Sequence, residues 1–341
     1  MKNSKKLKLA FSVLFLLLLV VGTVYILNKS GNKHFIKTSG NVFGTTYHIT
    51  YECNDSLQKE IEDVLNEVDM TFSMFNKQSL TARLNNGEDV ELNKMFTDVF
   101  ALTQKVSKET EGAFDITVAP LVNAWGFGTT ERTQPTKHMV DSIMKYVGYR
   151  KVSLKDKHLV KSDKHVQLDF SAIAKGYACD AVAQMLRKHG VDNYMVEIGG
   201  ELACRGKNQS NQLWTVGVQQ PEEDAMGNGG ELQAILDLNN RSVATSGNYH
   251  NYYYKDGKRY AHTIDPLQGK PVQHSLLSAT VLADNCTTAD AYATAFMVMG
   301  TDKVIHFLNK HKDIQAFLIY SNDKGKLTTW YSPSLKSCIR N

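Results

Sequence analysis

The sequence predicts an α+β protein, built largely from antiparallel or mixed sheets with packed helices, that follows one N-terminal transmembrane helix. Strand-like segments mostly follow one another along the chain, and helical segments gather between groups of them. The pair Asp256-Gly257 lies between two aromatic-rich arms, which is a strong signal for a β-hairpin. A chain of 341 residues with 42% hydrophobic content can also bury a large core. This order of elements differs from the strand-helix alternation of a doubly wound Rossmann fold.

The N-terminus has the composition of a membrane anchor. An apolar run over 9–27 is close to the roughly 20 residues that cross a bilayer. A basic stretch precedes it, with Lys2, Lys5, Lys6 and Lys8. A cleaved signal peptide usually has an apolar region of about 7–15 residues and then a small-residue cleavage site. No such site is found before Asn28, so an uncleaved signal anchor is expected.

These features divide the chain into four parts. A cytoplasmic basic segment (1–8), the signal anchor (9–27), a short polar linker (28–38) and one folded domain (39–335) are expected. Because positive charges tend to stay in the cytoplasm, the folded domain is expected on the other side of the membrane. The prediction is a single-pass protein of a bacterial inner membrane with a periplasmic domain.

Charge and cysteine spacing exclude two classes of site. The formal net charge is only +4 and the lysines are spread along the chain, so no nucleic-acid partner is expected. The five cysteines show neither C-x-x-C nor zinc-finger spacing, so a metal-thiolate site is not expected. One pair could bridge in an oxidising compartment, but buried free thiols are the simpler expectation.

The first half of the folded domain contains one expected strand and two expected helices. GTTYHITYEC (44–53) alternates in strand fashion. The segment 56–75 has helical spacing of its apolar residues, namely Ile61, Val64, Leu65 and Val68. A second helix is expected over 92–111, with Met95, Val99, Leu102 and Val106 facing inward. The segment 112–128 is rich in small and aromatic residues and is expected to be irregular.

The second half is richer in strands. The segment 165–190 is expected to run from an apolar strand through a small-residue turn into a helix that ends at Gly190. Short strands follow in YMVEIGGELACRG, LWTVGVQQP, ELQAILDL and RSVATSG, before the aromatic hairpin. After it come the strand LLSATVLA, the alanine-rich helix CTTADAYATAFMVMG (286–300), a helix over 301–312 and the strand QAFLIYS.

Three stretches could carry chemistry, and each has a plain structural interpretation as well. In DFSAIAKGYACD (169–180), a strand-to-helix turn with Lys175 at its helical end could hold a phosphate, or it could be a tightly packed turn. The pair Gly199-Gly200 allows a close backbone approach, or it forms a bulge. His262 would lie near Ser246 if the aromatic hairpin pairs as expected, although a strand histidine is more often structural.

The alanine-rich helix starts with an acid that also has two interpretations. Thr287 and Asp290 have the spacing of a capping box, in which each side chain bonds a free backbone N–H of the first turn. Asp290 and Thr294 are four residues apart and therefore share a helix face, so they could offer two oxygens to one Mg²⁺. From this stretch alone the cap is favoured.

Seven motifs, taken together, resemble one family. In order they are GTTYHI, GAFDITVAPLVNAWGFG, LDFSAIAKGYACD, EIGGEL, ATSGNY, His262-x-x-Asp265-Pro266-x-x-Gly269 and CTTADAYATAFMVMG. Their order and spacing are similar to those of the ApbE-type flavin transferases, which move FMN from FAD onto a protein. The resemblance covers roughly 39–332 and implies an ApbE-like fold, also described as T-fold-like.

The resemblance also implies roles for individual residues. It implies that Asp290 and Thr294 bind Mg²⁺ together with the backbone carbonyl of Ala172, and that His262 is important for transfer. It implies that FAD contacts a larger set: Phe43, Phe75, Ala113, Phe114, Asp115, Asp169, Lys175, Ser246, Gly247 and Ile264. Asp265 is expected to be structural.

This chain departs from the family pattern at three points. Phe43 replaces a frequent Met, and Phe75 replaces a frequent Tyr, so a ring can still stack on the isoalloxazine but the phenol hydroxyl is lost. Many relatives carry a lipid-anchored cysteine just after the signal, whereas no cysteine precedes Cys53 here.

The expected reaction is the Mg²⁺-dependent transfer of FMN from FAD to a threonine or serine hydroxyl of an acceptor protein, with release of AMP. The expected acceptors are membrane redox subunits or exported FMN-binding proteins. Two alternatives use the same residues: a Mg²⁺-dependent FAD pyrophosphatase that gives FMN to water, and a flavoprotein that only holds FAD. A degenerate structural domain that binds no FAD is a third.

Overall fold

The computed structural model describes residues 12–23, 33–129, 135–221, 231–248, 252–255 and 258–340. Its centre is an eight-stranded sheet in the order β1-β2-β5-β6-β9-β14-β15-β16. Every neighbouring pair in this sheet is antiparallel. The strands are β1 (His34–Val42), β2 (Thr45–Cys53), β5 (Tyr194–Ile198), β6 (Glu201–Arg205), β9 (Ser242–Gly247), β14 (Leu276–Ala283), β15 (Gln315–Ser321) and β16 (Leu327–Tyr331).

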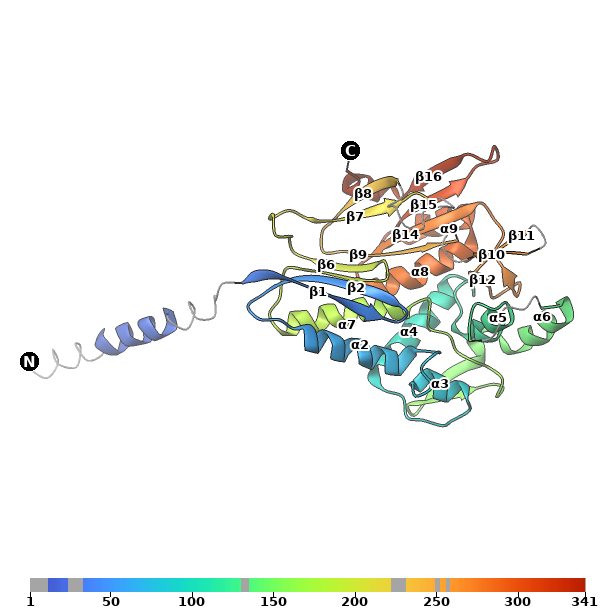
Figure 1. Cartoon of the computed structure of the whole chain (residues 1–341), viewed down its shortest axis with the longest axis horizontal. Coiled ribbons are helices and arrows are strands. Elements are labelled where there is room, and N and C mark those ends of the chain that lie inside the picture. The colour runs from blue at the N-terminus through green and yellow to red at the C-terminus, as the bar shows by residue number, and fades with distance from the viewer. Residues whose placement is uncertain are drawn as a thin grey trace, which may run out of the picture.

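Helices cover one face of the sheet in two layers (Figure 1). Helix α7 (Ala174–Lys188) packs on β5 and β6, and α8 (Cys286–Met299) packs on β9 and β14. Helices α2 (Gln58–Phe72) and α4 (Lys94–Glu109) pack on α7 and α8 from outside, and α9 (Thr301–Lys310) lies against β15. The expected α+β class, with a large antiparallel sheet and packed helices, is therefore confirmed.

A smaller layer covers the other face. The hairpin of β7 (Trp214–Gln219) and β8 (Leu232–Leu238) and the 3-10 helix η4 (Pro333–Cys338) enclose a second apolar cluster that includes Leu202, Trp214 and Phe317. Because both faces are covered, β14 is buried at almost every position and shows no alternation. This explains why its sequence, LLSATVLA, contains no charged residue.

The remaining elements are short. They are α3 (Leu80–Asn85), η1 (Ile116–Val118), α5 (Ala119–Ala124), α6 (Lys137–Ile143), η2 (Met144–Tyr146), η3 (Tyr149–Lys151), β3 (Val152–Lys155), β4 (His158–Lys161), β10 (Tyr252–Lys255), β11 (Lys258–Ala261), β12 (Ile264–Asp265) and β13 (Lys270–Pro271). Strands β10 and β11 pair antiparallel on either side of Asp256-Gly257, which confirms the expected hairpin, although the turn itself lies outside the described residues.

The predicted linker over 28–38 is wrong from residue 34 onward. Strand β1 begins at His34 and pairs with β2 along its whole length. The two strands are joined by Phe43 (φ 51°) and Gly44 (φ 74°), whose left-handed backbone suits a tight hairpin turn. Strand β1 is an edge strand with mostly exposed or half-buried side chains, so its sequence lacks a clear apolar face. The folded domain therefore begins inside the segment predicted as a linker.

Part of the predicted anchor is described as a helix, over residues 12–23. Among the described helices, none is both long enough and apolar enough to cross a membrane. The rest of the predicted anchor, 9–11 and 24–27, and the basic segment 1–8 lie outside the described residues.

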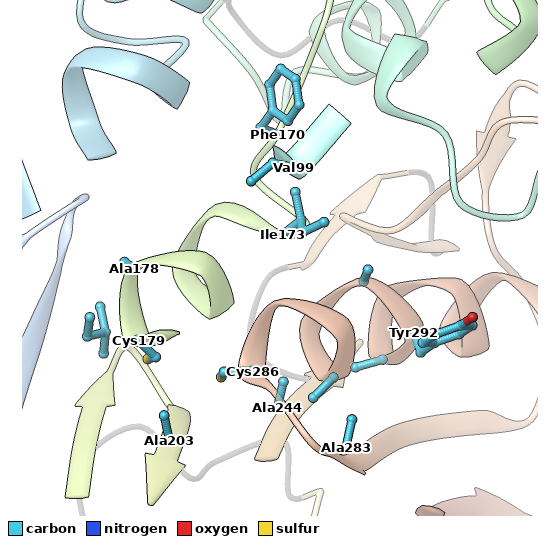
Figure 2. Close-up of a cluster of buried hydrophobic side chains, with 14 of the residues drawn as sticks. Val99, Phe170, Ile173, Ala178, Cys179, Ala203, Ala244, Ala283, Cys286 and Tyr292 are labelled. Atoms are coloured by element: carbon cyan, nitrogen blue, oxygen red, sulfur yellow. The ribbon is translucent and has the colours of Figure 1, made fainter. Parts of the chain in front are cut away.

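The core between the sheet and its helices is closed by small side chains. Figure 2 shows Cys179 of α7 and Cys286 of α8 beside Ala203 and Ala244 of the strands beneath. The Cys179 thiol donates to the Glu201 backbone oxygen at 3.3 Å, and the Cys286 thiol donates to the Val243 backbone oxygen at 3.6 Å. Both thiols are fully buried, and burial raises the pKa of each. All five cysteines are free; Cys179, Cys204 and Cys286 are buried, whereas Cys53 and Cys338 are half-buried. Small residues here let α7 and α8 approach each other closely.

Candidate active site

The start of α8 is held by α7. Asn285 caps the helix by accepting a hydrogen bond from the Thr288 N–H at 2.8 Å. The carboxylate of Asp180, on α7, accepts from the N–H groups of Cys286 at 2.9 Å and Thr287 at 2.8 Å, and from the Thr287 hydroxyl at 2.5 Å. The predicted capping box of Thr287 and Asp290 is therefore wrong, because Asn285 and the distant Asp180 already accept from the N–H groups of the first turn.

Asp290 points away from its own first turn, toward the start of α7. Its side chain is only 3% exposed, and Oδ2 accepts from the Gly176 N–H at 2.9 Å. The positive end of α7 favours a carboxylate at this place. Burial raises the pKa of Asp290, and the charge of Lys175 opposes that rise. Asp290 thus joins two helices at the edge of the predicted phosphate-binding turn.

Gly176 makes this contact possible. A Cβ at this position would lie 2.4 Å from the backbone oxygen of Cys286 and 2.7 Å from the Asp290 Cβ. No ordinary contact is that short, so any larger residue would push α8 away from α7.

We expect Gly176→Ala to destabilise the fold by about 1–3 kcal/mol, the usual cost of overpacking. In an open helix the same change would stabilise by about 0.5–1 kcal/mol, so the sign is diagnostic. Urea unfolding measures it, with Gln184→Ala on the exposed face of α7 as the control. A Gly176→Ala protein as stable as the wild type would contradict the close crossing.

Two hydroxyls contact each other further along α8 from Asp290. Thr294 is one turn further along α8, and its Oγ1 is 3.2 Å from Oγ of Ser246 at the end of β9. Gly247 follows Ser246, and Asn248 accepts a hydrogen bond from the Thr263 hydroxyl at 2.8 Å. The end of β9 is therefore linked to the segment after the β10–β11 hairpin, where His262 lies. The structure thus brings together the two regions that the hairpin was expected to join.

The turn before α7 is ordered by its own acid. Asp169 is buried, and its Oδ1 accepts from the Ser171 N–H at 2.7 Å. Its backbone N–H donates to the Ile116 oxygen at 2.7 Å, which connects this turn to the segment 113–116. Burial raises the pKa of Asp169, and the bonds from Ser171 partly offset that rise. Ala172 follows in the turn and is half-buried.

Lys175 is held by a carboxylate that sequence reasoning gave no role. Its Nζ is 2.6 Å from Oε2 of Glu201, which is only 3% exposed, whereas the lysine side chain is 31% exposed. Burial and the charge of Asp290 raise the pKa of Glu201 to about 8, although Lys175 opposes the rise. Burial disfavours the charged lysine, but Asp290 and Glu201 outweigh that effect and raise its pKa. The sequence did contain one signal for this role: Glu201 is the only acidic residue of β6 and stands at the start of this buried strand.

A cavity of about 720 Å³ opens next to this ion pair. Its lining includes three residues predicted to contact FAD, Phe43, Phe75 and Lys175. Ser171 and Ala174, from the turn before α7 and its first residue, complete that wall. Phe75 is 66% exposed, so its ring is available to a planar ligand. The cavity is large enough for a substantial part of a dinucleotide.

The segment 113–115 faces the interior rather than this cavity. Ala113 and Phe114 are buried in the core, and Asp115 accepts from the N–H and the hydroxyl of Thr117, both at 2.7 Å. Burial raises the pKa of Asp115, and the bonds from Thr117 oppose the rise. Because these three side chains are buried, the segment would contact a ligand through its backbone.

His262 is half-buried and lies in a separate aromatic corner. Its ring meets that of Phe127 edge to face, with 6.5 Å between centroids. The adjacent Ile264 is buried in a small cluster with Trp125, whose Nε1 donates to the Gly269 oxygen at 2.9 Å. The carboxylate of Asp265 accepts from the N–H groups of Leu267 at 2.8 Å and Gln268 at 3.2 Å. Asp265 is thus structural, as expected.

The donor set around Asp290 fits a hard divalent cation. The Asp290 carboxylate and the hydroxyls of Thr294 and Ser246 supply oxygen ligands of the kind that Mg²⁺ takes. In the described residues, no three His, Cys, Asp or Glu side chains gather as a metal cluster. A magnesium ion held by few protein ligands and by phosphate oxygens is therefore the type of metal site that these residues suit.

Comparisons with known proteins identify the family of this chain. The model of the ApbE family matches residues 43–318. The FAD:protein FMN transferase of Haemophilus influenzae is 38% identical over 312 residues, which cover 86% of this chain and 88% of that protein. That of Vibrio cholerae is 35% identical and covers 85% and 89%.

Solved structures show the same fold. The flavin transferase ApbE from Vibrio cholerae has a TM-score of 0.81 at 34% identity, covering 90% of this chain and 99% of that one. The apo form of the flavinyl transferase ApbE from Pseudomonas stutzeri has a TM-score of 0.79 at 31% identity, covering 90% and 97%. The chain is therefore a member of the ApbE family.

Proposed function

We propose that the protein moves FMN from FAD to a threonine or serine hydroxyl of an acceptor protein in a Mg²⁺-dependent reaction. Transfer from FAD to a protein follows from family membership and from relatives named FAD:protein FMN transferase. Two observations support the metal part: Asp290 accepts from the Gly176 N–H at the positive end of α7, next to Lys175 of the cavity wall, and Thr294, one turn along α8 from Asp290, lies against Ser246.

These residues suit a diphosphate that lies between the cavity and α8. Lys175 and the N-terminal end of α7 attract phosphate charge, while Phe43 and Phe75 offer rings to the isoalloxazine. Asp290, Thr294 and the Ala172 carbonyl would hold Mg²⁺, which would neutralise the phosphate oxygens and ease the departure of AMP. Asp169, Asp115 and the residues around Ile264 would shape the walls of the site.

The transfer balances with one nucleophile and one leaving group. The acceptor hydroxyl oxygen forms a bond to the FMN phosphorus, and the bond from that phosphorus to the bridging oxygen breaks, so AMP leaves with the oxygen. The hydroxyl proton must go to a base, and His262 is the proposed group. A pyrophosphatase would make the same cleavage with water in place of the hydroxyl.

Mass spectrometry tests the proposal. We expect that the full chain, FAD and Mg²⁺ add the mass of one FMN to an exported FMN-binding protein or a membrane redox subunit, and that a chelator stops it. An acceptor whose candidate Thr or Ser is replaced by Ala is the control. Rapid release of FMN and AMP with no labelled acceptor would support the pyrophosphatase instead.

We also propose that the protein is anchored in the bacterial inner membrane, with its catalytic domain on the periplasmic side. Residues 13–21 are all apolar and all exposed on their helix, so the domain does not cover them. The basic residues before them favour a cytoplasmic N-terminus.

Alkaline carbonate extraction measures the membrane anchorage. We expect the full chain to stay in the membrane pellet and a chain that begins at residue 33 to be released. Protease added outside spheroplasts should digest the domain, with a cytoplasmic protein as the protected control. Release of the full chain into the supernatant would refute the anchor.

A further inference from the structure

Three charged side chains meet beside the cavity. Lys175 is the second residue of α7, Glu201 begins β6, and Asp290 lies on α8. Asp290 bonds the N–H of Gly176, which directly follows Lys175 in the chain. Both carboxylates act on the lysine charge. A single ammonium group therefore has two possible partners, and one of them is the proposed metal ligand.

The structure pairs the lysine with Glu201. The 2.6 Å contact between Nζ and Oε2 is the ion pair that forms. The lysine stem runs along the β5–β6 turn, since a Cβ on Gly199 would lie 3.2 Å from its Cδ. Gly199 and Gly200 both have left-handed backbone, at φ 58° and 98°, so this turn sends Glu201 directly back toward Lys175.

The free oxygen of Asp290 depends on this pairing. Oδ2 accepts from Gly176, and among the described residues no hydrogen bond to Oδ1 is found. A lysine side chain is a flexible point charge, and only its partner fixes its position. Without Glu201, the remaining carboxylate beside Lys175 is Asp290. The ammonium would then move to Asp290 and compete there with a cation.

We propose that Glu201 is a positioning residue that keeps Lys175 away from Asp290 and so leaves the Asp290 carboxylate to the divalent cation. This inference rests on the proposed function, because it takes Asp290 as the metal ligand. The ion pair also keeps the ammonium on the cavity wall, where a phosphate would meet it. A buried ion pair adds little net stability, so its value here is in placing the charge.

Binding of Mn²⁺ alone, followed by electron paramagnetic resonance on the full chain in detergent, tests the inference without FAD or transfer. Glu201→Gln should raise the Mn²⁺ Kd about tenfold, since coupling within such a network is of this order. Lys175→Met should bind Mn²⁺ at least as tightly as the wild type. In the Lys175→Met background, Glu201→Gln should change the Kd by less than about twofold, because a buried carboxylate that has lost its cation tends to be neutral already.

Glu197→Gln is the matched control. Glu197 lies on β5 just before the same turn, but its carboxylate accepts from the Gly200 N–H at 2.7 Å, so its loss should leave the Kd unchanged. If Glu201→Gln fails to fold, Glu201→Asp withdraws the carboxylate by one methylene and should raise the Kd by a smaller factor. An unchanged Mn²⁺ Kd in Glu201→Gln or in Glu201→Asp overturns the inference.

Other outcomes are equally decisive. If Glu201→Gln weakens Mn²⁺ binding equally with and without Lys175, Glu201 acts on the cation itself and the inference is overturned. If the wild type binds no Mn²⁺, the metal part of the proposed function falls together with the inference. If the wild type binds Mn²⁺ and transfers FMN but the Glu201 variants bind normally, only the inference falls.

Discussion

Asp290→Asn is expected to lower the rate of FMN transfer by about a thousandfold, because a metal ion in phosphoryl transfer supplies several kcal/mol of charge stabilisation. The amide oxygen can still accept the Gly176 N–H, and the side chain keeps its size, so the α7–α8 contact should remain. The rate is measured as flavin fluorescence on the acceptor, at saturating FAD.

Asp284→Asn is the control for this change. Asp284 lies just before α8, is largely exposed and pairs with Arg241 at 2.7 Å, so its loss should leave the rate within about twofold. The proposed metal site would be untenable if Asp290→Asn transferred FMN normally, or if a chelator left the wild-type rate unchanged.

His262→Ala is the second large expected effect. Loss of a general base typically costs about 10²–10⁴-fold, so transfer should fall by that range while FAD binding changes little. Because a general base must be unprotonated to accept the hydroxyl proton, the wild-type rate should decline in acid. The variant should lose this decline.

A pH series on both proteins measures the effect. His158→Ala is the control, since His158 is an exposed histidine on β4 that pairs with Asp89 at 2.7 Å, far from this chemistry in sequence. A variant that lacked His262 and still transferred FMN at the normal rate would remove the histidine from the mechanism. Normal pH dependence with a reduced rate would assign it a positioning role.

Local sequence patterns were sufficient to predict the helices and strands that are buried along most of their length. The expected strand LLSATVLA corresponds to β14, QAFLIYS to β15, and the alanine-rich segment to α8. Gly190 follows the end of α7 with left-handed backbone, as expected. These elements are apolar enough to be recognised alone. The edge strands β1 and β16 were not expected, because half-exposed strands carry weak patterns and are defined by their partners.

For the candidate site too, the sequence predicted some residues and missed others. Motif spacing predicted Asp290, Thr294, Lys175 and His262 as site residues, and the first two lie one turn apart on α8. Motif spacing could not identify Glu201, because its role depends on an ion pair with Lys175 that joins a strand to a helix. It also predicted a capping box for Asp290, whereas the carboxylate bonds Gly176, which is 114 positions away in the sequence.

The sequence by itself determined the α+β class, most of the buried elements and the chemical types of the site residues, because periodicity, turn residues and motif spacing are local properties of the chain. Only the tertiary structure decided which carboxylate holds Lys175, which N–H holds Asp290, and where the sheet begins. Hydrogen bonds and ion pairs form between groups that folding brings within about 3 Å, and no local pattern records that distance.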